Sequence, residues 1–350
     1  MRIDHRIEAF STLGRVLEQI GKEKSFKIDS HDLESFEQAF DKALASNAWF
    51  TPESVFNMLQ SFGASMKTEE LARWTKMYDL DAIQEPKRIA VVMAGNIPAV
   101  GFHDFLSVLM AGHIIQAKLS SDDKFLIPAI ADLLIKIEPA FSDKISFADE
   151  KIKDFDSVIA TGSNNTSRYF NYYFGKYPHI IRKNRNALAV LTGNETAAEL
   201  KALGDDIFMY YGLGCRNISR LFVPKDYDLK TFFEAIEEFS SVGDHHKYRN
   251  NYDYNKSVFL INGDPHFDNG FLLLKEDHAM TSPVSVLHYE RYQSAEELNA
   301  FIAENTENIQ CVVSVSDDIP GGIPPGTAQH PNLWDYADGV DTMEFLITGF

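Results

Sequence analysis

The chain has 350 residues, of which 45% are hydrophobic, and its formal net charge at neutral pH is -18. A chain of this length can bury a large core, and we expect about two domains. Nucleic acids and anionic lipids bind proteins largely through Lys and Arg, so the acidic balance excludes both as expected partners.

Neither a signal peptide nor a membrane span is predicted. The opening residues, MRIDHRIEAF, carry charges throughout and have no apolar stretch before a cleavage site. The most apolar region, residues 89–117, is interrupted by polar or helix-breaking residues such as Asn96, Pro98 and Asp104, which a transmembrane helix tolerates poorly. We therefore expect a cytoplasmic protein without a transmembrane helix.

Residues 1–86 are predicted to form a helical subregion. Apolar residues recur there at helical spacing, as at Leu13 and Leu17. Two helix starts are indicated by capping residues, one at Ser30-His31-Asp32 and one at Thr51-Pro52-Glu53.

From Arg88 the pattern changes to alternating strands and helices. We predict strands over 89–94, 114–119 and 157–161, a helix near 102–110 and a helix capped at Ser121-Asp122. After the last strand we expect a turn over Gly162-Ser163-Asn164-Asn165 and then a helix through Tyr173. This order is typical of a doubly wound α/β domain. A glycine turn that enters a helix suits a phosphate, although no turn here has the G-x-G-x-x-G spacing.

The two cysteines lie in different surroundings. Cys311 sits in a β-branched run that predicts a strand, where it would be a small buried hydrophobe. Cys215 follows Gly212-Leu213-Gly214, between a predicted helix and a predicted strand over 221–223. A thiol on a glycine-rich loop near a cation is a candidate nucleophile.

Four segments in this order carry a family resemblance: Gly95-Asn96-Ile97-Pro98, Lys118, Thr161-Gly162-Ser163 and Gly212-Leu213-Gly214-Cys215. Together they resemble the aldehyde dehydrogenase superfamily, and the resemblance covers roughly residues 88–320. It continues at Ser282-Pro283-Val284 and at a helix capped by Ser294. It implies an α/β fold of two doubly wound domains with a helical N-terminal subregion.

Within that superfamily the chain is most similar to the acyl-CoA reductases of the LuxC type, which supply fatty aldehyde in bacterial bioluminescence. The segments that carry this likeness are 182–191, 212–219 and the C-terminal Trp334-Asp335 and Gly339-Val340-Asp341. The expected divisions are a helical subregion over 1–86, a nucleotide-binding domain over 87–186, a catalytic cysteine domain over 187–320, and a segment over 321–350 that returns to the cofactor domain.

The resemblance assigns roles to single residues. Cys215 would attack an acyl thioester, and its backbone N–H and the Asn96 amide would bind the oxyanion. Lys118 would bind the adenosine ribose or its 2′-phosphate, and Thr161, Gly162 and Ser163 would form the rest of a site for NADPH or NADH. The implied reaction is reduction of an acyl-CoA or acyl-protein thioester to an aldehyde.

Two departures from the superfamily pattern matter for the reaction. No Asp or Glu occurs from Ser157 to Asn194, whereas hydrolytic aldehyde dehydrogenases carry a glutamate base in the segment that corresponds to about residues 179–184. The missing glutamate favours a reductase. His179 is the residue of this segment that could act as a base in its place. The glutamate expected to hold the nicotinamide ribose is also absent from residues 278–283.

Several alternatives remain open at this point. The chain could be an acyl-phosphate reductase, another aldehyde dehydrogenase-like enzyme, or a non-catalytic acyl-binding subunit. The protein partners considered are an acyl-activating synthetase and a second copy of the chain. A cluster of cations, Arg168, Lys176, Arg182, Lys183 and Arg185, could meet phosphates or simply be solvated. His245-His246 lacks nearby ligands, so no metal is assigned.

Overall fold

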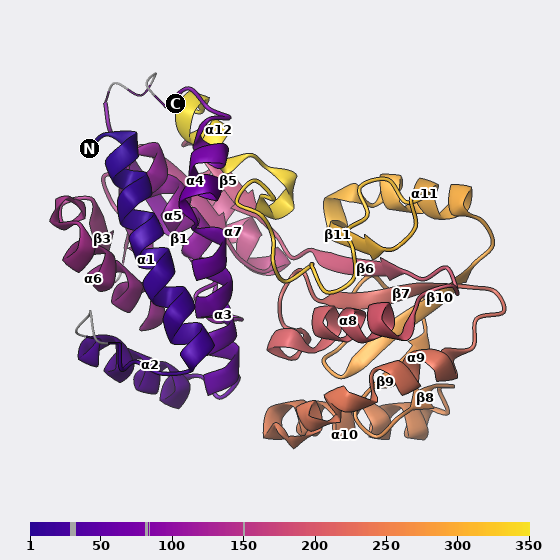
Figure 1. The fold of residues 1–350 in the computed structure, drawn as a ribbon. Coiled ribbons are helices and arrows are strands. Elements are labelled where there is room, and N and C mark those ends of the chain that lie inside the picture. The colour runs from indigo at the N-terminus through magenta and orange to yellow at the C-terminus, as the bar shows by residue number, and fades with distance from the viewer. Residues whose placement is uncertain (29–32, 81–82, 84, 150) are drawn as a thin grey trace. The chain divides into compact units, whose positions relative to one another are not determined.

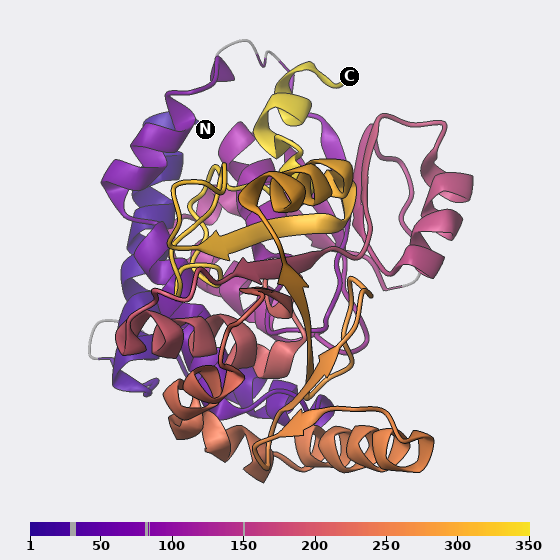
Figure 2. The same ribbon diagram turned by 90° about the vertical axis from the view of Figure 1, so that its right-hand side faces the viewer.

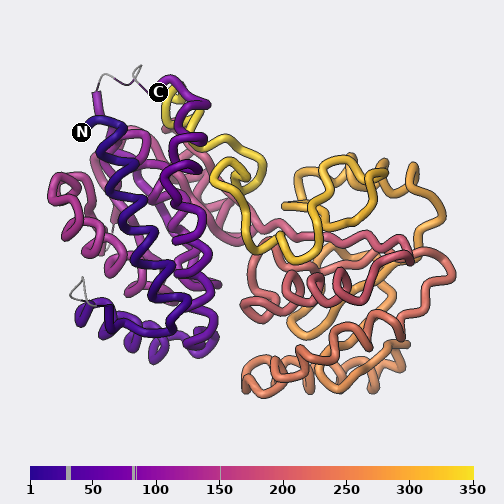
Figure 3. Tube along the Cα trace, viewed as in Figure 1, coloured from indigo at the N-terminus to yellow at the C-terminus, as the bar shows by residue number. Residues whose placement is uncertain are grey.

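The computed structural model describes residues 1–28, 33–80, 83, 85–149 and 151–350. The chain forms two compact units, residues 1–183 with 332–350, and residues 184–331. In the Cα trace of Figure 3, the C-terminal segment in yellow returns to the unit that holds the N-terminus. Residues 321–331 stay with the second unit, and the return begins at Asn332.

The first unit begins with helices α1 (Ile3–Glu23), α2 (Glu34–Ser46), α3 (Pro52–Ser65) and α4 (Thr68–Thr75). Leu13 and Leu17 are fully buried, as their spacing predicted. The predicted start of α3 is confirmed, because the Thr51 side chain accepts a hydrogen bond from the Ser54 N–H at 3.2 Å. The other predicted start, at residues 30–32, lies outside the described residues.

The rest of the first unit alternates strands with helices: β1 (Arg88–Val92), α5 (Phe102–Ala111), β2 (Ile114–Lys118), α6 (Leu126–Ile137), β3 (Ile145–Phe147), β4 (Ser157–Thr161), α7 (Asn164–Phe174) and β5 (His179–Arg182). The strands form a parallel sheet in the order β3-β2-β1-β4-β5. Figure 1 labels β1, β3 and β5 of this sheet. From β1 to β2 the chain moves one way along the sheet, and from β4 to β5 it moves the other way. Right-handed crossovers therefore put α5 and α7 on opposite faces.

The predicted helix start at Ser121-Asp122 is wrong. Residues 121–125 form turns, and α6 begins at Leu126. Asp123 in this stretch is buried, and its carboxylate accepts the Ala99 N–H at 2.6 Å and also the N–H of Leu126, the first residue of α6. The contact with Leu126 favours a helix that starts there and not at Ser121.

A buried ion pair ties β5 to α5, and a hydrogen bond from the same arginine ties β5 to the C-terminal segment of the first unit. Arg182 donates hydrogen bonds to the Asp104 carboxylate in α5 and, at 2.9 Å, to the Thr342 hydroxyl at the start of α12 (Thr342–Thr348). Both charged side chains are almost fully buried. For Arg182 both alternatives, a phosphate contact and a solvated side chain, are therefore wrong, because its guanidinium is buried and paired with Asp104.

The second unit contains β6 (Asn186–Val190), α8 (Ala197–Phe208), β7 (Ile218–Pro224), α9 (Leu229–Ala235), α10 (His246–Asn262), β8 (Phe267–Asp268), β9 (Leu273–Glu276), β10 (Val286–Tyr292), α11 (Ala295–Glu304) and β11 (Ile309–Ser314). Its sheet has the order β11-β6-β7-β10-β9-β8 and is parallel except between β8 and β9. The doubly wound α/β class is thus confirmed in both units.

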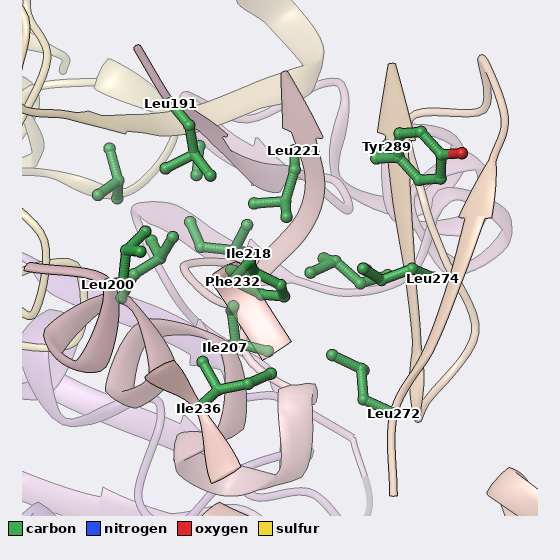
Figure 4. Packing of buried hydrophobic residues seen from close by; sticks show 14 of the residues in the cluster. Leu191, Leu200, Ile207, Ile218, Leu221, Phe232, Ile236, Leu272, Leu274 and Tyr289 are labelled. Atoms are coloured by element: carbon green, nitrogen blue, oxygen red, sulfur yellow. The ribbon is translucent and has the colours of Figure 1, made fainter. Parts of the chain in front are cut away.

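Helices cover both faces of this second sheet. Side chains of α8 and α9, such as Ile207 and Phe232, pack against Ile218 and Leu221 of β7 (Figure 4). On the other face, Leu298 of α11 packs against β6 and β11, along which α11 lies in Figure 2. The predicted cap of α11 is confirmed, since the Ser294 side chain accepts the Glu297 N–H at 3.3 Å.

Among the residues that the structure describes, no helix is long and apolar enough to cross a membrane.

The buried pair gives a test of what holds the first unit together. Arg182→Ala leaves the Asp104 carboxylate buried without its partner, and we expect it to lower the free energy of unfolding by about 3–5 kcal/mol. Lys183→Ala, at the exposed neighbouring position, is the control and should change it by at most about 0.5 kcal/mol. Urea unfolding followed by circular dichroism measures both, and equal midpoints for the two variants would contradict the assignment.

Candidate active site

Cys215 lies on a tight turn at the amino end of β7. The turn follows the short helix η3 (Met209–Gly212) and is closed by a hydrogen bond from the Asn217 N–H to the Gly214 carbonyl at 3.0 Å. Cys215 is exposed and forms no disulfide. The strand after it begins at Ile218, three residues earlier than predicted. The thiol is therefore presented at the amino edge of the second sheet.

Cys311 lies in β11, as predicted, and its thiol is mostly withdrawn from solvent. In the sheet register Cys311 pairs with Ala187, and Ala187 pairs with Ile218 near the start of β7. Burial raises the pKa of the Cys311 thiol to about 11, and the neighbouring positive charge and hydrogen bond of Arg216 offset this only in part. At neutral pH Cys311 is a thiol, which is a poor nucleophile.

The loop that carries Asn96 follows β1 and is held by the loop after β2. A Cβ on Gly95 would lie 2.7 Å from the Ser120 Cβ, so only glycine allows the two loops to approach this closely. Asp123 fixes the same loop by accepting the Ala99 N–H. Burial raises the pKa of Asp123 to about 6, although the N–H groups of Ala99 and Leu126 partly oppose the shift.

The predicted cofactor residues gather at the carboxyl edge of the first sheet. Val92 of β1 pairs with Lys118 on one side and with Ala160 on the other. Lys118 is the last residue of β2, and Thr161 is the last residue of β4. Connections leave β1 and β4 toward opposite faces, so this edge is a topological switch point, where open α/β sheets bind ligands.

Gly162 and Ser163 lead from β4 into α7. The Ser163 side chain caps α7 by accepting the Thr166 N–H at 3.2 Å. A Cβ on Gly162 would come within 2.8 Å of the Phe170 ring and 3.0 Å of Thr166, so a side chain at this position would require the helix to shift. The glycine lets α7 pack closely against the end of β4, and the N-terminus of α7 at Ser163 is a place where a phosphate is favoured.

The structure thus gathers Asn96, Lys118, Thr161, Gly162 and Ser163 on loops and strand ends at one edge of the first unit, and it places Cys215 in the second unit.

The histidines near the predicted segments contact backbone groups or neighbouring side chains. His179 is exposed on β5, and its Nδ1 lies 2.8 Å from the Tyr177 carbonyl. His278 is exposed and lies 3.1 Å from the Glu290 carboxylate. His245 caps α10 and stacks on His246. Within the described ranges no group of three or more His, Cys, Asp or Glu residues is arranged to hold a metal ion.

Sequence reasoning missed the polar residues that support the Cys215 turn. Asn217 is buried, and its side chain bonds to four backbone groups of α8 and the turn. Asp206 of α8 is fully buried and accepts the N–H groups of Gly326 and Ala328 at 2.6 and 2.9 Å. Burial raises the pKa of Asp206 to about 6. The only signal in the sequence is a polar residue next to an apolar strand or helix face, which is too common to be decisive.

A cavity of about 330 Å³ lies at the opposite edge of the second sheet from Cys215. It is lined at the carboxyl ends of β6 and β7 by residues that include Thr192, Glu195, Asp226 and Tyr227. Because Cys215 precedes β7 whereas the cavity follows it, the cavity is not part of the predicted site.

Comparison with protein families gives one match. The model of a family described as acyl-CoA reductase (LuxC) matches residues 17–242, which is more than half of the chain and includes Asn96, Lys118 and Cys215. Comparison with the curated proteins finds no matching sequence.

Solved structures of aldehyde dehydrogenases share the fold. An indole-3-acetaldehyde dehydrogenase in complex with NAD+ is 14% identical, with a TM-score of 0.65 over 91% of this chain and 74% of that one. Aldehyde dehydrogenase 21 from Physcomitrella patens is 12% identical, with a TM-score of 0.66 over 99% and 84%. An NADP-dependent glyceraldehyde-3-phosphate dehydrogenase from Bacillus halodurans is 13% identical, with a TM-score of 0.59 over 91% and 75%. The predicted aldehyde dehydrogenase-like fold is confirmed.

The different burial of the two thiols predicts selective alkylation. With iodoacetamide at about pH 7.5, Cys215 should be labelled first, because it is exposed while burial keeps Cys311 protonated. Raising the pH should increase labelling of Cys311 about tenfold per unit until its pKa is reached. Peptide mass spectrometry measures both sites. Equal labelling rates at neutral pH would contradict the difference in burial.

Proposed function

The chain belongs to the acyl-CoA reductase (LuxC) family, and from this membership we propose that it reduces an acyl thioester, either acyl-CoA or acyl-protein, to an aldehyde with NADPH or NADH. The protein is an oxidoreductase of that family. The observation that carries the proposed reduction of an acyl thioester is that Cys215 is exposed on a fixed turn, inside the segment that matches the family.

In the proposed reaction the Cys215 thiolate attacks the carbonyl carbon of the thioester. The carbon–sulfur bond to the leaving thiol breaks, and the acyl group remains on Cys215 as a new thioester. The backbone N–H of Cys215 is the first proposed oxyanion donor, and the amide of Asn96 is assigned the second by the family resemblance. A nicotinamide, when bound, supplies the hydride that converts the acyl group to an aldehyde and releases the Cys215 thiolate.

The residues at the carboxyl edge of the first sheet fit a dinucleotide. Gly162 lets α7 pack closely against the strand end, the N-terminus of α7 is capped by Ser163, and Lys118 at the end of β2 supplies positive charge. These features support the assignment of Lys118, Thr161, Gly162 and Ser163 to the cofactor. Similar structures were solved with NAD+ or NADP, so the proposed cofactor is either NADH or NADPH.

The lack of acidic residues between Ser157 and Asn194 supports reduction over hydrolysis. A carboxylate base there would activate water and release the acyl group as an acid, which would waste the intermediate.

Mass spectrometry of the intact protein tests the proposed nucleophile. Mixing with an acyl-CoA should add one acyl group at Cys215, and NADPH or NADH should then remove it as aldehyde. Cys215→Ser should abolish both steps and leave the fold intact, because a hydroxyl is far less nucleophilic than a thiolate at neutral pH. Cys311→Ser is the matched control and should retain both. Absence of an adduct on the unmodified protein would favour an acyl-phosphate reductase or a non-catalytic acyl-binding subunit.

Without reduced cofactor, the acyl adduct on Cys215 should persist, because no nearby carboxylate of residues 157–194 activates water. Acid release, measured by chromatography of the products, should then be far slower than aldehyde formation in the presence of NADPH or NADH. Release of acid as fast as aldehyde would indicate a hydrolytic dehydrogenase, and His179→Ala would then identify or exclude His179 as its base.

A further inference from the structure

The side chain of Asn217 connects the end of α8 to the turn that carries Cys215. Its Oδ1 accepts the Gly214 N–H at 2.8 Å, and its Nδ2 faces the carbonyl oxygens of Met209, Asp206 and Ile207 at 2.8, 3.1 and 3.3 Å. Asn217 is 3% exposed. A buried amide surrounded by four backbone groups satisfies hydrogen bonds that water cannot reach.

These four groups belong to the two segments that define where Cys215 lies. The carbonyls of Asp206 and Ile207 are among the last of α8, which have no partner within the helix. The Gly214 N–H belongs to the turn, and the Asn217 backbone N–H also bonds to the Gly214 carbonyl. Asn217 therefore bonds to Gly214 twice, once through its side-chain oxygen and once through its backbone N–H, and so fixes the turn.

The backbone between these segments takes a conformation that needs such support. Tyr210 and Tyr211 have φ angles of 53° and 60°, and Gly212 continues the left-handed stretch at 77°. For residues other than glycine this region costs roughly 1–2 kcal/mol each. The Tyr211 ring lies 4.3 Å from the His245 ring, between centroids, and the Tyr210 phenol is withdrawn from solvent, which raises its pKa. Such strain persists only where surrounding contacts over-determine the backbone.

We infer that Asn217 is a positioning residue for Cys215: its buried amide holds Met209, which leads into the left-handed residues 210–212, and the Gly214 turn in the one arrangement that presents the thiol for acyl transfer. The inference rests on the proposed function, in which Cys215 is the nucleophile. Asn217 acts through the backbone and does not touch the substrate. A displacement of about 1 Å at a reacting group can reduce a rate by about 100-fold.

The test substitution is Asn217→Asp, which keeps the size and the acceptor for the Gly214 N–H but replaces the NH₂ donor with an oxygen that faces three carbonyls. The matched control is Asn255→Asp in α10, where the same change removes a buried donor to the Val284 carbonyl, 3.0 Å away, in the same unit. Single-turnover acylation of Cys215 by acyl-CoA, the dissociation constant for NADPH, and the thermal midpoint are measured for both variants.

We expect Asn217→Asp to slow acylation by about 10- to 100-fold while the dissociation constant for NADPH stays within about twofold. Lowering the pH should bring the acylation rate of Asn217→Asp closer to that of the wild type at the same pH, because a protonated carboxyl at position 217 regains one hydrogen-bond donor. Asn255→Asp should acylate at the wild-type rate even if its thermal midpoint falls. Acylation of Asn217→Asp within twofold of wild type, or equal losses in both variants, would overturn the inference.

A second measurement separates this inference from the proposed function. In the unmodified protein the Gly214 amide should exchange with solvent at least about 100-fold more slowly than an unprotected amide, because it bonds to Asn217. Rapid exchange would overturn the inference even if Cys215 forms an acyl adduct. If the Gly214 amide exchanges slowly but the protein forms no acyl adduct, the hold of Asn217 on the turn is supported and the proposed acyl transfer by Cys215 is rejected. If Asn217→Asp does not fold, Asn217→Ser, which keeps one donor and one acceptor, takes its place under the same criteria.

Discussion

Parallel strands joined by right-handed crossovers are the constraint on which the rest of this protein depends. In a parallel sheet every carboxyl end lies at one edge and every amino end at the other, so the loops after β1, β2 and β4 gather together whatever their sequence. The strand ends at Lys118 and Thr161 are brought to one edge in this way. The same rule puts the Cys215 turn, which precedes β7, at the amino edge of the second sheet.

Burial of polar groups decides how these loops are held. Asp123 bonds to the Ala99 N–H beside the Asn96 loop, and Asp206 bonds to two N–H groups of the segment 326–328. In both cases burial raises the pKa of the carboxyl to about 6, which indicates that these bonds form at some electrostatic cost. The carboxylates persist because each satisfies backbone groups that would otherwise be buried without a partner.

The two thiols of the second unit differ in their exposure to solvent. Cys311 lies within a strand, where desolvation favours its neutral form, and a nearby guanidinium only partly compensates. Cys215 lies on a turn that is open to solvent. The turn that carries Cys215 is held by the Asn217 side chain and by the backbone bond between Asn217 and Gly214.

The sequence alone predicted most of the regular elements and the segment that carries the proposed nucleophile, Cys215. The strand over Ser157–Thr161 and the caps at Thr51 and Ser294 follow from local patterns, because periodicity and capping depend on near neighbours along the chain. Only the tertiary structure decided that Arg182 is buried whereas Lys183 beside it is exposed, and that Asn217 supports the Cys215 turn. Those outcomes depend on partners that are distant in the sequence or on the path of the folded backbone, and burial and hydrogen-bond geometry have no local signature in the sequence.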